Sequence, residues 1–249
     1  MTQSSVFIRE KRETGFSSLL PSLRRTFLQS YFDIYHRLEV KGEENIPQGP
    51  VLLVANHGGG FDLDVLALIN RGHSWRSIEV MIADAWHHSQ SLWGKIAVGS
   101  GIATPTSGGF DITTLAPFFE TREPDCPMVA IFPEGDQGRF EHRYQLRPFF
   151  PGVVRIALFY DVPVVPVAMV GFHRASPIFY DLAVDHGPAD PIVMMPPLPL
   201  KLTIEYGEPI RLEKPAHPLS RHEETEIANT TIRSALARLL RKYHRVACL

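Results

Sequence analysis

Residues 51–62 read VLLVANHGGGFD, an apolar run followed by a histidine, three glycines and an aspartate. Five consecutive apolar residues are typical of a strand that is buried on both faces, as in a parallel sheet. A second run of this kind, MVAI at residues 128–131, precedes FPEG at residues 132–135. Both polar strings are therefore predicted to lie at carboxyl ends of strands, where sites gather in parallel α/β sheets.

Strand-like and helix-like segments alternate along the chain. Further strands are expected at 77–82, 162–170 and 202–206, and helices at 62–69, 112–121, 152–160 and from Ser220 to about Val246. This alternation predicts an α/β fold with a mixed, mostly parallel sheet flanked by helices. Pro163 and Pro166 favour an edge or interrupted strand at 162–170, because proline cannot donate to a ladder.

The first forty residues have a different character. Apolar residues from position 21 to 38 recur at helical spacing beside Arg24, Arg25 and Arg37, which predicts an amphipathic helix suited to a membrane surface. We therefore expect two parts, an N-terminal helical, membrane-facing segment at 1–40 and an α/β domain with a C-terminal helix at 41–249. The sequence has no run of 18 apolar residues, so no transmembrane helix is expected.

Composition restricts the class of function. Of the 249 residues, 44% are hydrophobic and 21% charged, which is ordinary for a globular protein. The formal net charge of −2 argues against nucleic acid as a partner, because phosphate-binding proteins usually carry a basic excess. The two cysteines, Cys126 and Cys248, give neither a disulfide framework nor a metal-binding spacing, so we expect no metal and a reducing, cytoplasmic compartment.

His57 and Asp62 are the residue types of a general-base pair. A neutral histidine takes a proton from a hydroxyl, and a carboxylate on its other ring nitrogen fixes the tautomer. A single pair at this spacing is a weak pattern, and a loop histidine followed by a helix cap explains it about as well. Asp64 is interpreted as a carboxylate in the first turn of the following helix, where the helix dipole favours it.

The order of the strings resembles the glycerolipid acyltransferase family, of the 1-acylglycerol-3-phosphate acyltransferase type. The shared pattern covers residues 38–206 and consists of Asn-His-x4-Asp, Phe-Pro-Glu-Gly and Val-Pro-x-Val-Pro, with GEENIP at 42–47 as a lead-in. The resemblance implies transfer of a fatty acyl chain from acyl-CoA or acyl-carrier protein to the hydroxyl of a lysophospholipid or related lipid. It implies no cofactor, no acyl-enzyme and a place on the cytoplasmic face of a membrane.

The resemblance also implies roles for residues of this chain. It makes His57 the base and Asp62 its partner. The substrate-binding residues that it implies are Asn56, Phe132, Pro133, Glu134 and Gly135. The family's second block ends in a phosphate-binding arginine, whereas this chain has no Lys or Arg between Lys95 and Arg122. Arg139 is the candidate to hold a phosphate instead, since guanidinium groups suit phosphate oxygens.

Two other interpretations stay open. HGGGF at 57–61 also resembles the oxyanion-hole loop of hormone-sensitive-lipase-like esterases, although the chain lacks their Gly-x-Ser-x-Gly string. The altered phosphate-binding block is also compatible with a catalytically idle, lipid-binding relative. The intact His57 and Asp62 pair argues against that second alternative.

Overall fold

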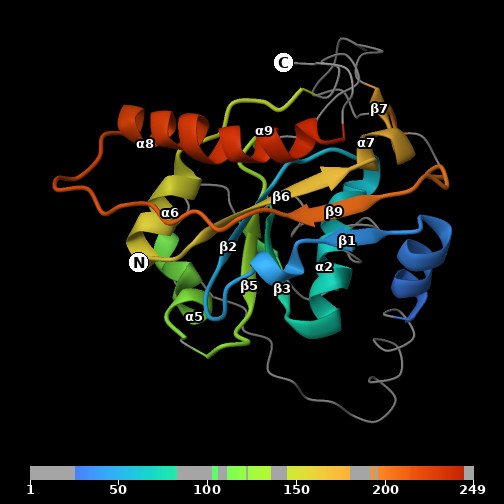
Figure 1. The fold of residues 1–249 in the computed structure, drawn as a ribbon, viewed down its shortest axis with the longest axis horizontal. Helices are drawn as coiled ribbons and strands as arrows, with labels where there is room; N and C mark the ends of the chain where they lie inside the picture. The colour runs from blue at the N-terminus through green and yellow to red at the C-terminus, as the bar shows by residue number, and fades with distance from the viewer. Residues whose placement is uncertain are drawn as a thin grey trace, which may run out of the picture.

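The computed structural model describes residues 26–82, 103–105, 111–121, 123–135, 145–179, 192–193 and 196–243. Within this part, seven strands form one sheet in the order β1-β9-β6-β2-β5-β3-β4 (Figure 1). The strands are β1 (Glu39–Lys41), β2 (Leu52–Ala55), β3 (Ile78–Ile82), β4 (Ala103–Pro105), β5 (Met128–Ile131), β6 (Val164–Val170) and β9 (Thr203–Tyr206). All neighbours are parallel except β6 and β9. The expected mixed, mostly parallel sheet is confirmed.

Helices cover both faces of this sheet. They are α2 (Leu63–Trp75), α5 (Ala116–Phe119), α6 (Gly152–Tyr160), α7 (Phe172–Ala175), α8 (Arg221–Ile227) and α9 (Ser234–Arg241). A π-helical segment, η5 (Ala228–Arg233), joins α8 to α9 into one long rod. The capping box of Ser220 and Glu223 opens this rod as the sequence predicts. A small separate sheet pairs β7 (Ile178–Phe179) with β8 (Ile192–Val193).

Side chains that alternate along each strand build two cores. On β2, Leu53 and Ala55 face a core shared with α2 and α7, whereas Leu52 and Val54 face a core shared with α6 and the α8–α9 rod. Every residue of β2 is buried, because helices lie on both faces. The apolar runs of the sequence thus form the inner strands, and the polar strings after them reach the carboxyl edge of the sheet.

Strand β6 corrects one expectation. Its prolines suggested an edge or interrupted strand, but β6 lies between β9 and β2. The backbone N and carbonyl of a strand residue point to the same side, and the carbonyl of Pro166 accepts from the N–H of Gly207, just beyond the end of β9. The N–H that Pro166 lacks therefore faces a position where β9 has already ended, and the inner strand tolerates proline there.

The N-terminal helix is described from residue 26 to η1 (Tyr31–Tyr35). Phe32 is fully buried in the core shared with α2, whereas Phe27 and Ile34 are 68% and 75% exposed. The helix thus packs one side on the domain and presents large apolar groups on another. In the part of the chain that the structure describes, no helix has the length and apolarity needed to cross a membrane.

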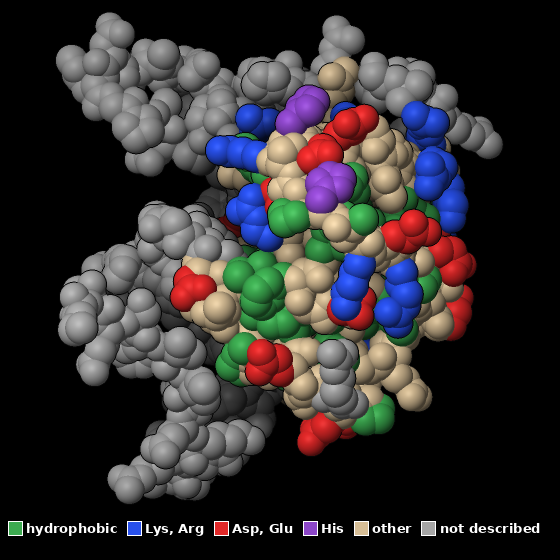
Figure 2. Space-filling model, turned by 90° about the vertical axis from the view of Figure 1, so that its left-hand side faces the viewer, with side chains coloured by type: hydrophobic (Ala, Val, Ile, Leu, Met, Phe, Trp, Pro, Cys, Tyr) green, Lys and Arg blue, Asp and Glu red, His purple; other side chains and the backbone are tan. Residues whose placement is uncertain are grey.

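The opposite side of the molecule carries charges of both signs. Figure 2 views the side on which α5, α6 and α8 lie in Figure 1. Acidic and basic side chains are interspersed there, around a group of hydrophobic side chains in the middle of the face. Phe159 of α6 is 59% exposed on this side, which is comparable with the exposure of Phe27.

Candidate active site

The string after β2 lies at the carboxyl edge of the sheet, held to the neighbouring strand by Asn56. The side-chain amide of Asn56 donates to the carbonyl of Met169, 3.1 Å away, and its oxygen accepts from the N–H of Met169, 2.8 Å away. Both polar ends of the amide are therefore used on β6. Asn56 thus fixes the backbone that carries His57. Its expected part in substrate binding stays a prediction.

His57 is held by Asp64. Nδ1 of His57 lies 2.8 Å from Oδ2 of Asp64, a carboxylate that is fully buried in the first turn of α2. The same oxygen accepts from the N–H of Gly58, and the other oxygen from the N–H of Val65. Because three donors surround this carboxylate, it is a fixed partner that sets the ring orientation and keeps the proton on Nδ1.

Asp62, which sequence reasoning placed on this nitrogen, lies beside the other one. Its Oδ1 is 3.7 Å from Nε2 of His57, longer than a hydrogen bond. The short 3-10 turn Gly60–Asp62 and the left-handed backbone of Asp62 (φ 50°) set this arrangement, since they bring the following turn of α2 back toward the ring. Asp62 occupies the N-cap position of α2 without a side-chain capping bond.

Three carboxylates surround the His57 ring. Burial by itself lowers the pKa of His57, but the negative charges of Asp64, Asp62 and Glu134 outweigh it and raise the pKa to about 9. The His57 side chain keeps 14% of its surface exposed. With Nδ1 engaged by Asp64, Nε2 is the nitrogen that can take a proton from a bound group.

The Glu134 side chain links the two strings through hydrogen bonds to backbone N–H groups. Its Oε1 accepts from the N–H of His57 at 3.0 Å, and its Oε2 from the N–H of Arg147 at 2.8 Å. The side chain is 4% exposed, and burial raises the pKa of Glu134 while these two hydrogen bonds lower it. The carboxylate therefore organises the loops around His57. Its expected part in substrate binding stays a prediction.

The rest of the FPEG string packs around this carboxylate. Phe132 stacks at a tilt on the His57 ring, with 4.4 Å between ring centroids, and the carbonyl of Pro133 accepts from the N–H of Phe150. Gly135 has φ +71°, and a Cβ there would lie 2.4 Å from the Phe150 ring. The left-handed backbone favours glycine here, and a Cβ would displace the exposed Phe150 ring.

The three glycines after His57 also have assigned contacts. The N–H of Gly58 is bound by Asp64, and the N–H of Gly60 donates to the carbonyl of Ser176 at 2.7 Å. Gly59 has φ 146°, and a Cβ at this position would lie only 3.2 Å from the Cβ of Phe172 in α7. Since two of the three N–H groups are already bonded, this loop is poorly arranged as the oxyanion hole of an esterase.

The structure places His57 and Glu134 side by side at the carboxyl edge, where the sequence predicted both strings, but the carboxylate on Nδ1 is that of Asp64 and not of Asp62. The sequence contains both candidates, Asp62 and Asp64, at the start of a helix. Only the conformation of the turn at residues 60–62 decides which carboxylate reaches Nδ1. Arg139 lies outside the described residues. Within the described ranges, no group of three or more His, Cys, Asp or Glu side chains is placed to hold a metal ion.

Comparisons with known proteins identify the family of this chain. A family model described as Acyltransferase matches residues 37–170, which include both strings. Uncharacterized protein Rv0502 of Mycobacterium tuberculosis is 32% identical over 258 residues, covering 92% of this chain and 69% of that protein. Uncharacterized protein ML2427 of Mycobacterium leprae is 29% identical over 243 residues, and the match spans 87% of this chain and 64% of that relative.

A solved structure has the same fold. It is the 1-acyl-sn-glycerophosphate (LPA) acyltransferase PlsC of Thermotoga maritima, with a TM-score of 0.52 and 18% identity over 94% of this chain and 85% of that one. At this identity the likeness concerns the fold. The family model matches more than half of the chain and contains the His57 site, and we conclude that the chain belongs to the acyltransferase family.

Proposed function

We propose that this protein transfers a fatty acyl group from a thioester, acyl-CoA or acyl-carrier protein, to the hydroxyl of a lysophospholipid or related lipid. The observation that carries the proposal is the His57–Asp64 pair at the carboxyl edge of the sheet, inside the segment that matches the acyltransferase family. The solved relative from Thermotoga maritima is a 1-acyl-sn-glycerophosphate acyltransferase, which favours a lysolipid as the class of acceptor.

In this proposal His57 is the general base. Nε2 takes the proton of the acceptor hydroxyl as its oxygen attacks the thioester carbonyl, while Asp64 stabilises the imidazolium that forms. The carbon–sulfur bond then breaks, and the leaving thiolate takes the proton from Nε2. The products are an acylated lipid and a free thiol, and His57 returns to its starting state. No enzyme nucleophile takes part.

An apolar surface beside this site supports a lipid substrate and a place on a membrane. Exposed apolar side chains occur on the N-terminal helix and on the segment 196–200: Phe27, Ile34, Tyr35, Leu198 and Leu200. The two segments are joined, since the hydroxyl of Tyr35 donates to the carbonyl of Pro197 and Arg37 donates to that of Pro199. We call this set of five residues the apolar edge.

The apolar edge is connected to the glycine loop. The N–H of Leu198 donates to the carbonyl of Ala175 at 2.6 Å, and the next residue, Ser176, accepts from Gly60. Large exposed apolar groups that lie together mark interaction surfaces. A peripheral position on the cytoplasmic face of a membrane, with the apolar edge against lipid, would bring a lysolipid within short reach of His57.

The proposal is tested with purified protein, a long-chain acyl-CoA and a panel of lysolipids, by following thiol release and the acylated product. Thiol release should require an acceptor lipid, and His57→Gln should reduce it about 10²- to 10⁴-fold while circular dichroism stays unchanged. Lipid profiles of a host with and without the protein then identify the acceptor without a prior guess.

Two results would replace this function by another. Thiol release that needs no acceptor, together with an acyl group trapped on a serine or cysteine, would indicate a hydrolase. Tight binding of lysolipid without any transfer, unchanged in His57→Gln, would indicate an idle lipid-binding protein.

A further inference from the structure

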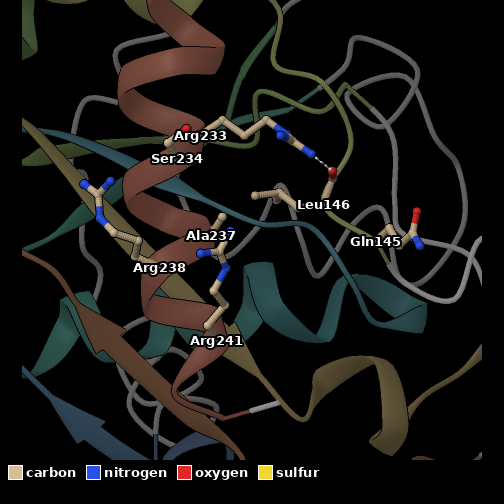
Figure 3. Close-up of a pocket in the computed structure, with 7 residues that line it drawn as sticks. All are labelled: Gln145, Leu146, Arg233, Ser234, Ala237, Arg238 and Arg241. Carbon is tan, nitrogen blue, oxygen red and sulfur yellow. Dashed lines mark hydrogen bonds between the residues drawn. The ribbon is translucent and has the colours of Figure 1, made fainter. Parts of the chain in front are cut away.

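A cavity opens between the C-terminal rod and the segment that follows residue 144. Its volume is about 420 Å³, and three arginines line it with four smaller or uncharged residues: Gln145, Leu146, Arg233, Ser234, Ala237, Arg238 and Arg241 (Figure 3). Residues 234, 237, 238 and 241 recur at helical spacing and so share one face of α9. The small side chains of Ser234 and Ala237 leave the hollow between the arginines.

The three arginines play two different parts in this cavity. Nε and Nη2 of Arg233 donate to the carbonyls of Arg147 and Leu146, at 2.9 and 2.5 Å, so this guanidinium is fixed as part of the wall. Figure 3 shows it reaching across to Leu146. Arg238 and Arg241 are exposed and form no ion pair within the described residues. Their forks are available to a ligand.

Among the described residues, no carboxylate forms an ion pair with Arg238 or Arg241. The sequence contains no Asp or Glu after Glu226, and Glu205 is used by the next cation, Lys242, at 2.6 Å. The helix dipole favours a cation in the last turn, which explains the sign of charge at this end of α9. It does not explain the hollow that Ser234 and Ala237 leave beside Arg241, which an anion would fill. In Figure 3 Arg238 extends on the side of α9 away from Leu146, at the rim of the cavity.

The cavity wall is also part of the active-site scaffold. Leu146, which lines the cavity, precedes Arg147, whose N–H donates to Glu134, and Glu134 in turn holds the backbone of His57. Asn229 of η5 fixes the same segment, because its side chain bonds both the N–H and the carbonyl of Phe149. A ligand in the cavity therefore lies against the loop that organises the catalytic histidine.

We infer that Arg238 and Arg241, beside the fixed Arg233, form a phosphate-binding site for one of the two substrates of this enzyme. Guanidinium forks match the oxygens of a phosphate ester, and two of them in one cavity favour it over a neutral group. The chain has no Lys or Arg between Lys95 and Arg122 to fill this role from the earlier segment. That the phosphate belongs to the lysolipid acceptor or to coenzyme A rests on the proposed acyl transfer. The binding of a phosphate ester in this cavity does not.

Binding is measured by calorimetry with two phosphate esters, glycerol 3-phosphate as the acceptor headgroup and coenzyme A as the donor, and the double variant Arg238→Gln/Arg241→Gln is compared with Arg221→Gln. Arg221 is an exposed arginine at the start of α8, outside the cavity. The double variant should bind one of the esters roughly 10- to 100-fold more weakly, because it loses two charge-assisted contacts. Arg221→Gln should bind like the wild type.

A second pair of variants separates the cavity from charge alone. Ala237→Leu fills the hollow and keeps every arginine, so it should weaken binding of the same ester. Ala235→Leu changes a residue of α9 that does not line the cavity and should leave this binding unchanged. Weaker binding of glycerol 3-phosphate by the variants assigns the site to the acceptor, and weaker binding of coenzyme A assigns it to the donor. All binding is repeated in His57→Gln, which abolishes the proposed chemistry, so failure of acyl transfer and failure of this site give different results.

Equal binding of both esters by the wild type and the double variant would overturn the inference. So would a loss confined to anionic vesicles, with soluble esters unaffected, because the arginines would then form a membrane-facing charge patch. Unchanged affinity in Ala237→Leu would show that the cavity is not the place of binding.

Discussion

Oδ2 of Asp64, seven residues after His57 in the chain, lies 2.8 Å from Nδ1 of His57. Oδ1 of Asp62 lies 3.7 Å from Nε2, on the other side of the same ring. The two carboxylates therefore act on different nitrogens of one imidazole. Asp64 orients the ring, and Asp62 contributes charge at Nε2, the nitrogen that takes the proton in the proposed mechanism. This division leads to the first two predictions.

Asp64→Asn should reduce kcat/KM about 10²- to 10⁴-fold at every pH, because the amide cannot hold the proton on Nδ1 and the wrong tautomer results. Asp62→Asn should retain substantial activity at neutral pH, since no hydrogen bond to the ring is lost. Steady-state kinetics of both variants measure this. A severe loss in Asp62→Asn with mild effects in Asp64→Asn would reverse the assignment.

The pH profile reports the charge around His57. Because the base must be neutral and its pKa is raised to about 9, kcat/KM should rise tenfold per pH unit up to about pH 9 and then level off. Asp62→Asn removes one of the charges that raise the pKa, so its profile should level off at lower pH. If kcat/KM of the wild type stopped rising near pH 6.5, the raised pKa of His57 would be contradicted.

Glu79 on β3 should make stability depend on pH. Burial raises its pKa to about 7 from 4.5, so the folded state holds a proton between these values that the unfolded chain has lost. The free energy of unfolding should therefore fall as the pH rises from 4.5 to 7, by about 2–3 kcal/mol from this group. Chemical denaturation of Glu79→Gln should lack this decrease, and the two proteins should differ most above pH 7.

Arg76 should anchor the amino edge of the sheet. Its buried guanidinium donates to the carbonyls of Cys126, Pro47 and Gly49 at 2.8, 3.1 and 2.6 Å, joining the loops before β2 and β5. Arg76→Met should cost about 2–4 kcal/mol in urea unfolding, because these carbonyls lose their donor. The exposed Arg221→Met serves as a control and should change stability by less than about 0.5 kcal/mol.

The apolar edge should drive membrane binding. Phe27→Ser/Ile34→Ser should weaken partitioning into phospholipid vesicles by at least about tenfold, since insertion of each side chain is worth about 1.5 kcal/mol or more. Phe159→Ser removes a comparably exposed phenylalanine from α6, on the other face of the sheet, and should have no effect. Equal losses from both changes would mean that the apolar edge is not the contact surface.

The sequence by itself determined five strands of the main sheet, the main helices and the two strings of the site, but not the short edge strands β1 and β4. Runs such as Leu52–Ala55 and Met128–Ile131 have only one favourable arrangement, burial on both faces of a parallel sheet, and their polar ends must then meet at its carboxyl edge. The capping box at Ser220 likewise fixes where the last helix begins. These features are local, because residue period and propensity decide them.

Only the tertiary structure decided which groups meet across that edge. A left-handed turn at Asp62 selects Asp64 as the partner of His57, and strand order puts β6, prolines included, inside the sheet. The arginines of α9 face residue 146 only because the C-terminal rod packs beside the Glu134 loop. Such contacts depend on turn dihedrals and on packing between distant segments, and no sequence pattern of either segment alone contains them.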